Sequence, residues 1–150
     1  MVKNKPSILI VDDDASIGET LSTILQQKGY NTDTAKNGLE AIKKSKAKFF
    51  NLALLDIKLS DMEGTKLLTT MHETLPKMTK VMITGYPSLE NAIESLNHGA
   101  DAYLIKPVKP EKLLELIEEK LQEQSQAEKM SEEKMTEWIK TRAHKIEHDI

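Results

Sequence analysis

Short runs of apolar residues, repeated along the chain, constrain the fold of this protein more than any other feature of its 150 residues. A short run that is apolar at nearly every position is typical of a strand buried on both faces, as in a parallel sheet. Such runs predict strands at residues 7–11, 52–56, 80–84 and 102–105, with a weaker one at 31–35.

Amphipathic helical patterns separate these runs. Gly29 and Gly99 follow two of the patterns, where a residue with positive φ commonly ends a helix. Pro110 suits the first turn of the last helix. Strands and helices that alternate with right-handed crossovers predict a doubly wound α/β fold, in which helices cover both faces of a five-stranded parallel sheet. The apolar positions lie within residues 17–25, 39–42, 67–71, 89–96 and 113–121.

Polar side chains lie at or just after the ends of several predicted strands. The carboxyl ends of parallel strands meet at one edge of the sheet, so we expect these side chains to converge. Because the chain has no cysteine and the candidate ligands are oxygen atoms, Mg²⁺ or Mn²⁺ is favoured over zinc, with an anionic group beside the cation. The candidates are Asp12, Asp13, Asp56, Thr84 and Lys106.

Each candidate also has an ordinary structural explanation when it is taken alone. An aspartate after a strand is usually a turn or helix-cap residue, and we expect Asp14 to be the N-cap of the first helix. Threonine is common on strands, and a lysine before proline is usually solvated. The three adjacent carboxylates of residues 12–14 repel one another unless a cation offsets their charge, so the combination favours a site.

The motifs "VDDD", "LLDIKLSDMEG", "MITG" and "YLIKP", in this order and spacing, resemble the receiver domain of two-component response regulators. The resemblance covers about residues 5–123 and implies a sheet with strand order 2-1-3-4-5. It implies that Asp56 accepts a phosphoryl group from a phosphohistidine on a partner sensor histidine kinase. Asp13 matches the family's principal Mg²⁺ ligand, and Asp12 matches the second acidic residue, which usually acts through a metal-bound water. Asp56 and the backbone carbonyl of Lys58 match the further ligands.

Three further positions match residues that act on the phosphoryl group or respond to it. Thr84 and Lys106 match the residues that bind the phosphoryl oxygens. Thr84 and Tyr103 match the pair that changes conformation on activation. The family pattern also implies a cis peptide bond before Pro107.

The chain departs from the family pattern near the expected site. Ser60 and Glu63 stand where the family commonly has proline and aspartate, and Gly85 stands where alanine is frequent. We therefore expect a different loop geometry and a site more open to water. Lys58 and Tyr86 occupy positions that, in the family, tune hydrolysis of the acyl phosphate.

Residues 124–150 predict a helical extension outside a receiver domain of residues 1–123, because they lack proline and glycine and are rich in helix formers. The extension either continues the last helix or begins a new one at Ser131, with Met130 and Met135 as a hydrophobic staple. Trp138 would pack against a partner or the receiver, or lie at the surface. A short coiled-coil-like repeat is formed by Met135, Ile139, Arg142 and Ile146.

The end of the chain suggests two weaker interpretations. His144 and His148 are spaced to bind a metal on one helical face, but no third ligand is evident, so a solvated helix end is preferred. The last residues, "EHDI", resemble the start of the phosphoacceptor box of histidine kinases. The chain could therefore be the N-terminal receiver of a larger kinase.

Charge and hydropathy exclude some partners. A net charge of −3 gives no electrostatic reason to expect broad nucleic-acid binding, which normally needs a basic face, although it leaves room for local basic patches. We therefore expect no nucleic-acid partner and no DNA-binding output domain in this chain. The apolar run near the N-terminus is too short for a signal peptide or a membrane span, which predicts a cytoplasmic protein without membrane contact.

Two functional classes remain. The first is a phosphorylation-controlled switch that acts through a downstream protein or a homodimer, formed by the extension or by the face of the fourth helix, fifth strand and fifth helix. The second is a Mg²⁺-dependent phosphatase or phosphotransferase. That enzyme needs a second carboxylate two residues after Asp56, where Lys58 stands. We therefore expect a switch whose only chemistry is its own phosphorylation and dephosphorylation.

Overall fold

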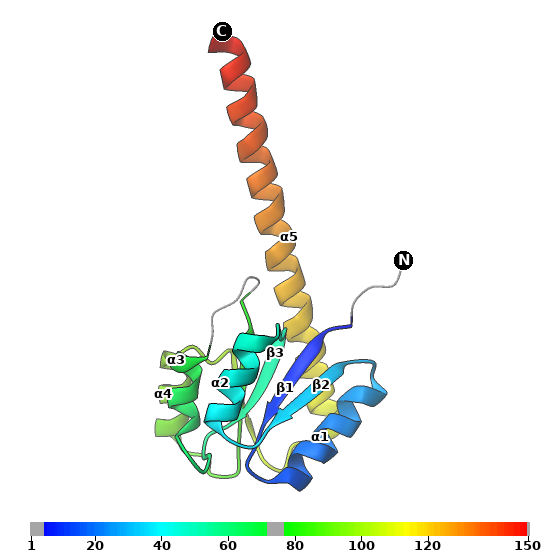
Figure 1. Cartoon of the computed structure of the whole chain (residues 1–150), viewed down its shortest axis with the longest axis vertical. Helices are drawn as coiled ribbons and strands as arrows, with labels where there is room; N and C mark the ends of the chain where they lie inside the picture. The colour runs from blue at the N-terminus through cyan, green and yellow to red at the C-terminus, as the bar shows by residue number, and fades with distance from the viewer. Residues whose placement is uncertain (1–4, 72–76, 150) are drawn as a thin grey trace.

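The computed structural model describes residues 5–71 and 77–149, with side chains described as far as residue 143. Strands and helices alternate along this part of the chain, as the apolar pattern predicts (Figure 1). The elements are β1 (Ser7–Val11), α1 (Ala15–Gln27), β2 (Asn31–Ala35), α2 (Gly38–Ala47), β3 (Leu52–Asp56), α3 (Gly64–Thr70), β4 (Thr79–Thr84), α4 (Leu89–Asn97), β5 (Ala102–Ile105) and α5 (Pro110–Asp149).

The strands form one parallel five-stranded sheet with the order β2-β1-β3-β4-β5. The predicted doubly wound α/β fold and its strand order are therefore confirmed. The strand order reverses between β1 and β3, which lie next to each other although α1, β2 and α2 separate them in the chain. Ligands of such sheets bind outside the carboxyl ends of the strands at this place.

Alternating strand residues supply two apolar layers, one on each face of the sheet. Leu9 and Val11 belong to the layer that includes residues of α2 and α3. Ile8 and Ile10 belong to the layer that includes residues of α1 and α5. All four side chains are at most 1% exposed, which explains why this strand is apolar at every position.

The predicted helix boundary residues are confirmed. Asp14 is the N-cap of α1, and its side chain accepts a hydrogen bond from the Ser16 N–H at 3.0 Å. Gly29 and Gly99 have φ values of 90° and 99°, and each lies just beyond a helix. Pro110 begins α5. Local chemistry visible in the sequence therefore sets where these helices start and stop.

α5 is one continuous helix of 40 residues, so of the two alternatives for the extension, continuation of the last helix is confirmed and the restart at Ser131 is wrong. Ser131 lies inside the helix, and a run of helix formers without glycine or proline gives no reason for a break. Met130 and Met135 are 55% and 59% exposed, which is not the packing of a staple. Trp138 is 57% exposed, with the Arg142 guanidinium 5.1 Å from its ring centre.

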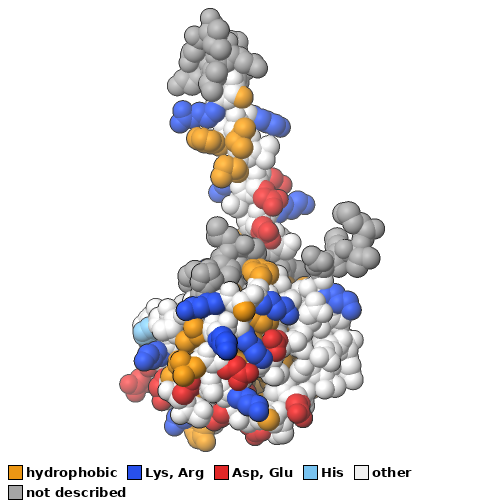
Figure 2. Space-filling view, viewed as in Figure 1, with side chains coloured by type: hydrophobic (Ala, Val, Ile, Leu, Met, Phe, Trp, Pro, Cys, Tyr) orange, Lys and Arg blue, Asp and Glu red, His pale blue; other side chains and the backbone are white. Residues whose placement is uncertain are grey.

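The second half of α5 projects away from the body of the protein (Figure 1). The strand arrows in Figure 1 point to the carboxyl ends of the strands, and α5 leaves the body at the opposite end. Hydrophobic side chains gather on this projecting part (Figure 2). Among the described helices, none is long and apolar enough to cross a membrane.

Candidate functional site

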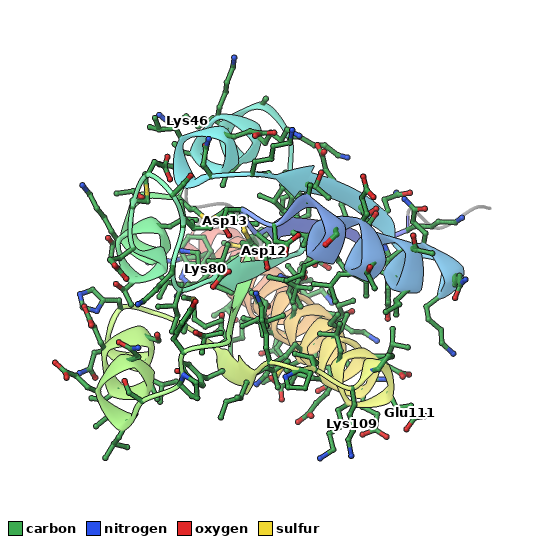
Figure 3. The ribbon with its side chains drawn as sticks, turned by 90° about the horizontal axis from the view of Figure 1, so that it is seen from below. Asp12, Asp13, Lys46, Lys80, Lys109 and Glu111 are labelled. Atoms are coloured by element: carbon green, nitrogen blue, oxygen red, sulfur yellow. The ribbon has the colours of Figure 1, made fainter. Side chains whose placement is uncertain are left out.

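Three carboxylates meet where β1 and β3 end side by side. Asp12 and Asp13 follow β1, and Asp56 is the last residue of β3. One oxygen from each lies within 4.8 Å of the others. Asp12 and Asp56 are 6% and 8% exposed, whereas Asp13 is exposed. Figure 3 shows Asp12 and Asp13 near the centre of this edge, between the helices of the two faces.

Lys106, which follows β5, reaches this cluster. Its Nζ atom donates to Oδ2 of Asp12 at 2.8 Å and to Oδ2 of Asp56 at 3.2 Å. Burial would lower the pKa of Lys106, but the hydrogen bond to Asp12 and the charge of Asp56 outweigh it, so the pKa is raised and the ammonium stays charged. Burial raises the pKa of Asp56, and Lys106 only partly offsets this. The site thus holds a buried carboxylate beside a fixed cation.

Asp12 is already hydrogen bonded through both carboxylate oxygens. Its Oδ1 atom accepts from the Asp14 N–H at 2.9 Å, and its Oδ2 atom accepts from Lys106. Asp13 is the most accessible carboxylate of the cluster. The atoms that these three carboxylates could offer to a metal are all oxygens, which fits a hard divalent cation such as Mg²⁺.

Thr84 is the last residue of β4, and Tyr103 lies within β5. Thr84 is fully buried, and its Oγ1 atom accepts a hydrogen bond from the Tyr86 N–H at 2.9 Å. The Tyr103 hydroxyl is also buried, and within the described part of the chain it has no hydrogen-bond partner. The two residues predicted to form a switch therefore lie on neighbouring strands.

The loop between β3 and α3 forms a tight turn beside Asp56. The Lys58 N–H donates to Oδ1 of Asp56 at 3.2 Å. Lys58 and Glu63 form an isolated antiparallel bridge, and Leu59 N–H donates to the Met62 carbonyl at 3.2 Å. That Ser60 and Glu63 give this loop an unusual geometry for the family stays a prediction.

Side chains of the loops after β3 and β4 meet outside the cluster. The Nζ atom of Lys58 lies 4.5 Å from the ring centre of Tyr86, a distance that allows a cation–π interaction. Tyr86 is 62% exposed. The two residues that the resemblance linked to acyl-phosphate hydrolysis are therefore in contact with each other.

Sequence reasoning missed one contact near the site. Both carboxylate oxygens of Asp61 accept backbone hydrogen bonds from the start of α2, at Gly38 and Leu39. An aspartate in a loop is a common helix cap. Its partner helix lies 23 residues earlier, however, so no local pattern could have identified the pairing.

Of two remaining sequence expectations, the structure confirms one and does not test the other. The Lys106–Pro107 peptide bond is cis, as the resemblance implied. His144 and His148 lie outside the residues whose side chains are described, so the suggested metal pair stays a prediction.

Residues 8–118 match the family model of the response regulator receiver domain. This chain belongs to that family. A CheY-like receiver domain protein from Methanospirillum hungatei is 52% identical, with a TM-score of 0.79 over 83% of this chain and 99% of that chain. The predicted family is therefore confirmed, and the acidic cluster lies at the edge where receiver domains generally bind Mg²⁺.

Other relatives of this receiver domain are larger regulators. The transcriptional regulatory protein ZraR of Klebsiella oxytoca is 39% identical over 114 residues, which are 76% of this chain and 26% of that protein. A Burkholderia pseudomallei response regulator, solved with a phosphorylated aspartic acid, calcium ion and citrate, is 30% identical, with a TM-score of 0.70 over 85% of this chain and 75% of that chain. The chain spans about a quarter of the length of the ZraR relatives.

Proposed function

We propose that this receiver domain is a phosphorylation-controlled signalling switch that accepts a phosphoryl group on Asp56 from a phosphohistidine of a sensor histidine kinase. The observation that carries the proposal is the placement of the Asp56 carboxylate against both Lys106 and the acidic residues after β1. A cytoplasmic location belongs to the same proposal, because the family acts with histidine kinases.

The reaction needs an oxygen nucleophile in line with the leaving group and positive charge against the transferring oxygens. An Asp56 carboxylate oxygen forms the new bond to phosphorus, the phosphorus–nitrogen bond breaks, and the kinase imidazole keeps the bonding electrons. Lys106 Nζ, already 3.2 Å from Asp56, supports the charge of the phosphoryl oxygens. The Thr84 oxygen accepts from Tyr86, so its hydroxyl proton is available to donate to one of them.

Asp12, Asp13, Asp56 and the Lys58 carbonyl would hold the metal, with Mn²⁺ as a substitute for Mg²⁺. When bound, Mg²⁺ neutralises the phosphoryl oxygens during transfer. Asp13 is the exposed carboxylate of the cluster, which supports a direct role for it, and the resemblance to the family supports a water-mediated role for Asp12. Binding of the metal and phosphorylation should therefore be coupled.

The alternative of a phosphatase or phosphotransferase acting on other substrates is less well supported. Such an enzyme needs a general acid two residues beyond the nucleophile. Lys58 occupies that position, and its ammonium group lies over the Tyr86 ring. We propose that the chemistry is limited to phosphorylation and dephosphorylation of Asp56.

Incubation with acetyl phosphate and Mg²⁺, followed by intact mass measurement, tests the phosphoacceptor. We expect one phosphoryl adduct on the wild type and none on Asp56→Asn. Asp33→Asn is the matched control, because Asp33 lies on β2 and pairs with Lys44 away from the site. A full adduct on Asp56→Asn, or labelling that persists in excess chelator, would contradict the proposal.

We propose that the switch acts by pairing of two copies of this chain through α5. The projecting part of α5 exposes Met135, Trp138 and Ile139, which fall on one side of the helix by helical spacing. Most helical stability in proteins comes from packing such a face, so a free helix of this kind favours association with another helix. The relatives named as transcriptional regulators make gene control one candidate result of such pairing.

Sedimentation of the full chain with and without beryllofluoride tests this output. Ile139→Ser should weaken self-association, whereas Met130→Ser, half a turn out of phase with Ile139, should not. If Ile139→Ser leaves the oligomeric state unchanged, the pairing surface lies elsewhere. The exposed face of α4 and β5, which carries Leu89, Ile93, Leu96 and Ile105, would then be the next candidate.

A further inference from the structure

The loop that follows the proposed phosphoacceptor is attached at its tip to a different helix. Oδ1 of Asp61 accepts a hydrogen bond from the Gly38 N–H at 2.8 Å, and Oδ2 accepts from the Leu39 N–H at 3.0 Å. α2 has its own cap as well, since Oδ1 of Asn37 accepts from the Glu40 N–H at 2.8 Å. Asp61 therefore adds contacts that tie the β3–α3 loop to α2 rather than merely starting the helix.

An apolar contact reinforces this attachment. Gly38 is buried, and a Cβ atom at this position would overlap the side chain of Met62. Met62 also packs against the apolar layer that contains residues of α2 and α3. The loop tip is thus held by two charge-assisted hydrogen bonds from Asp61 and by close packing of the next residue.

Contacts within the β3–α3 loop connect its anchored tip to the residues next to Asp56. Lys58 bridges to Glu63, and Leu59 N–H donates to the Met62 carbonyl at 3.2 Å. At the other end of the loop, Gly64 lies so close to the Asp56 carbonyl that a Cβ atom would overlap it. Held at both ends, the loop has little freedom to move the Lys58 carbonyl relative to the carboxylates.

We propose that Asp61 is a positioning residue for the cation site: by anchoring the β3–α3 loop to the start of α2, it fixes the Lys58 carbonyl in place beside Asp12, Asp13 and Asp56. This inference rests on the proposed Mg²⁺ function of the cluster. Asp61 itself does not touch the cation or the transferring group. The hydrogen bonds from Gly38 and Leu39 lower the pKa of Asp61, so it is ionised at neutral pH.

The test compares three variants of the full chain: Asp61→Ala, Asp61→Asn and Asn37→Ala. Asn37→Ala removes a cap from the same helix but leaves the loop attachment intact, so it controls for loss of α2 stability. The readouts are the Mg²⁺ dissociation constant from calorimetry, the Tm, and hydrogen exchange of the Gly38 and Leu39 amides without Mg²⁺.

We expect Asp61→Ala to weaken Mg²⁺ binding about tenfold, the scale found when a residue that orients a metal ligand is removed. The Gly38 and Leu39 amides should exchange faster in this variant. Asp61→Asn keeps an acceptor oxygen, so its affinity should be intermediate. Asn37→Ala should lower the Tm while its Mg²⁺ affinity stays close to that of the wild type.

Three outcomes would overturn the inference. If Asp61→Ala loses amide protection but binds Mg²⁺ like the wild type, Asp61 is only a helix cap. If Asn37→Ala weakens binding as much as Asp61→Ala, the effect comes from α2 stability. If the wild type itself binds no Mg²⁺, the proposed function of the cluster fails first, and the positioning role falls with it. Should Asp61→Ala not fold, the comparison of Asp61→Asn with Asn37→Ala decides.

Discussion

Lys106 and Asp12, which lie 94 residues apart in the sequence, form an ion pair in which the lysine Nζ atom donates to Oδ2 of the aspartate at 2.8 Å. The same Nζ atom is 3.2 Å from Oδ2 of Asp56. A lysine thus supplies part of the positive charge that these adjoining carboxylates need. Lys106 and a bound divalent cation would both offset the charge of these carboxylates.

Lys106→Met should have opposite effects on stability and on metal binding. Without Mg²⁺ it should lower the free energy of unfolding by about 1–3 kcal/mol, because two buried carboxylates lose their cation. Mg²⁺ should bind on the order of tenfold more tightly, because a nearby positive charge is gone. Urea unfolding in chelator and calorimetric titration measure the two effects.

The control for this variant is Lys58→Met, which removes a lysine at the same sheet edge whose Nζ atom lies over the Tyr86 ring. Lys58→Met should change the free energy of unfolding and the Mg²⁺ affinity less than Lys106→Met does. A Lys106→Met protein with weaker Mg²⁺ binding would contradict the idea that Lys106 and the cation compete.

Asp56→Asn should stabilise the fold near neutral pH. Burial raises the pKa of Asp56 in the folded state, with Lys106 partly opposing it. The folded state then holds this proton more tightly than the unfolded chain. The carboxyl therefore favours folding below its ordinary pKa of 3.8, and this contribution is lost as the pH rises through the raised folded value. Asparagine does not ionise and escapes that loss.

The difference in Tm between Asp56→Asn and the wild type should therefore grow by a few degrees from acidic to neutral pH. Thermal unfolding monitored by circular dichroism across this range measures it. Asp13→Asn is the comparison, since it removes an exposed carboxyl of the same cluster. A difference that stays constant or shrinks as the pH rises would show that burial of the Asp56 charge is not the cause.

Gly64→Ala should destabilise the protein by roughly 1–3 kcal/mol, because the new methyl group would overlap the backbone carbonyl of Asp56. The backbone must shift beside the phosphoacceptor, so acetyl phosphate should label the variant more slowly. At Gly85 a Cβ atom would be 3.8 Å from Lys106 Cδ, an ordinary contact, so Gly85→Ala should be tolerated. Equal urea midpoints for the two variants would contradict this steric explanation.

Tyr86→Ala should shorten the lifetime of the phosphorylated protein. The Lys58 Nζ atom lies 4.5 Å from the centre of the Tyr86 ring, and we expect this pair of side chains to limit access of water beside the site. Tyr86→Phe keeps the ring and should retain a lifetime close to that of the wild type. Intact mass followed over time after removal of acetyl phosphate measures the loss. A lifetime unchanged in Tyr86→Ala would mean that the contact does not shield the acyl phosphate.

Gln124→Ala should lower the free energy of unfolding by about 1–2 kcal/mol. The Gln124 Nε2 atom donates to the carbonyl oxygens of Asn51 and Lys77, each at 2.8 Å, and so attaches α5 to the body at the point where the helix leaves it. Gln122→Ala, on the exposed side of the same helix, is the control. If urea unfolding finds the same stability for both variants, this attachment contributes little.

The elements of the fold could be read along the chain because their signals are local. Apolar runs such as residues 7–11 mark strands that are buried on both faces, and Asp14, Gly29 and Gly99 mark helix ends through the backbone geometry that they favour. The carboxyl ends of parallel strands meet by topology alone, so the convergence of Asp12 and Asp56 also followed from the strand order.

Other features depend on which surfaces meet in three dimensions, and no local pattern encodes them. The attachment of Asp61 to α2, the contact of Lys58 with Tyr86 and the bonds of Gln124 to the body join residues from separate elements. The sequence did not decide whether α5 continues through Ser131, and here the reason is different. A serine with methionines at the staple positions, here Met130 and Met135, has the same local chemistry inside a helix as at its start. The uninterrupted helix formers around it favour continuation.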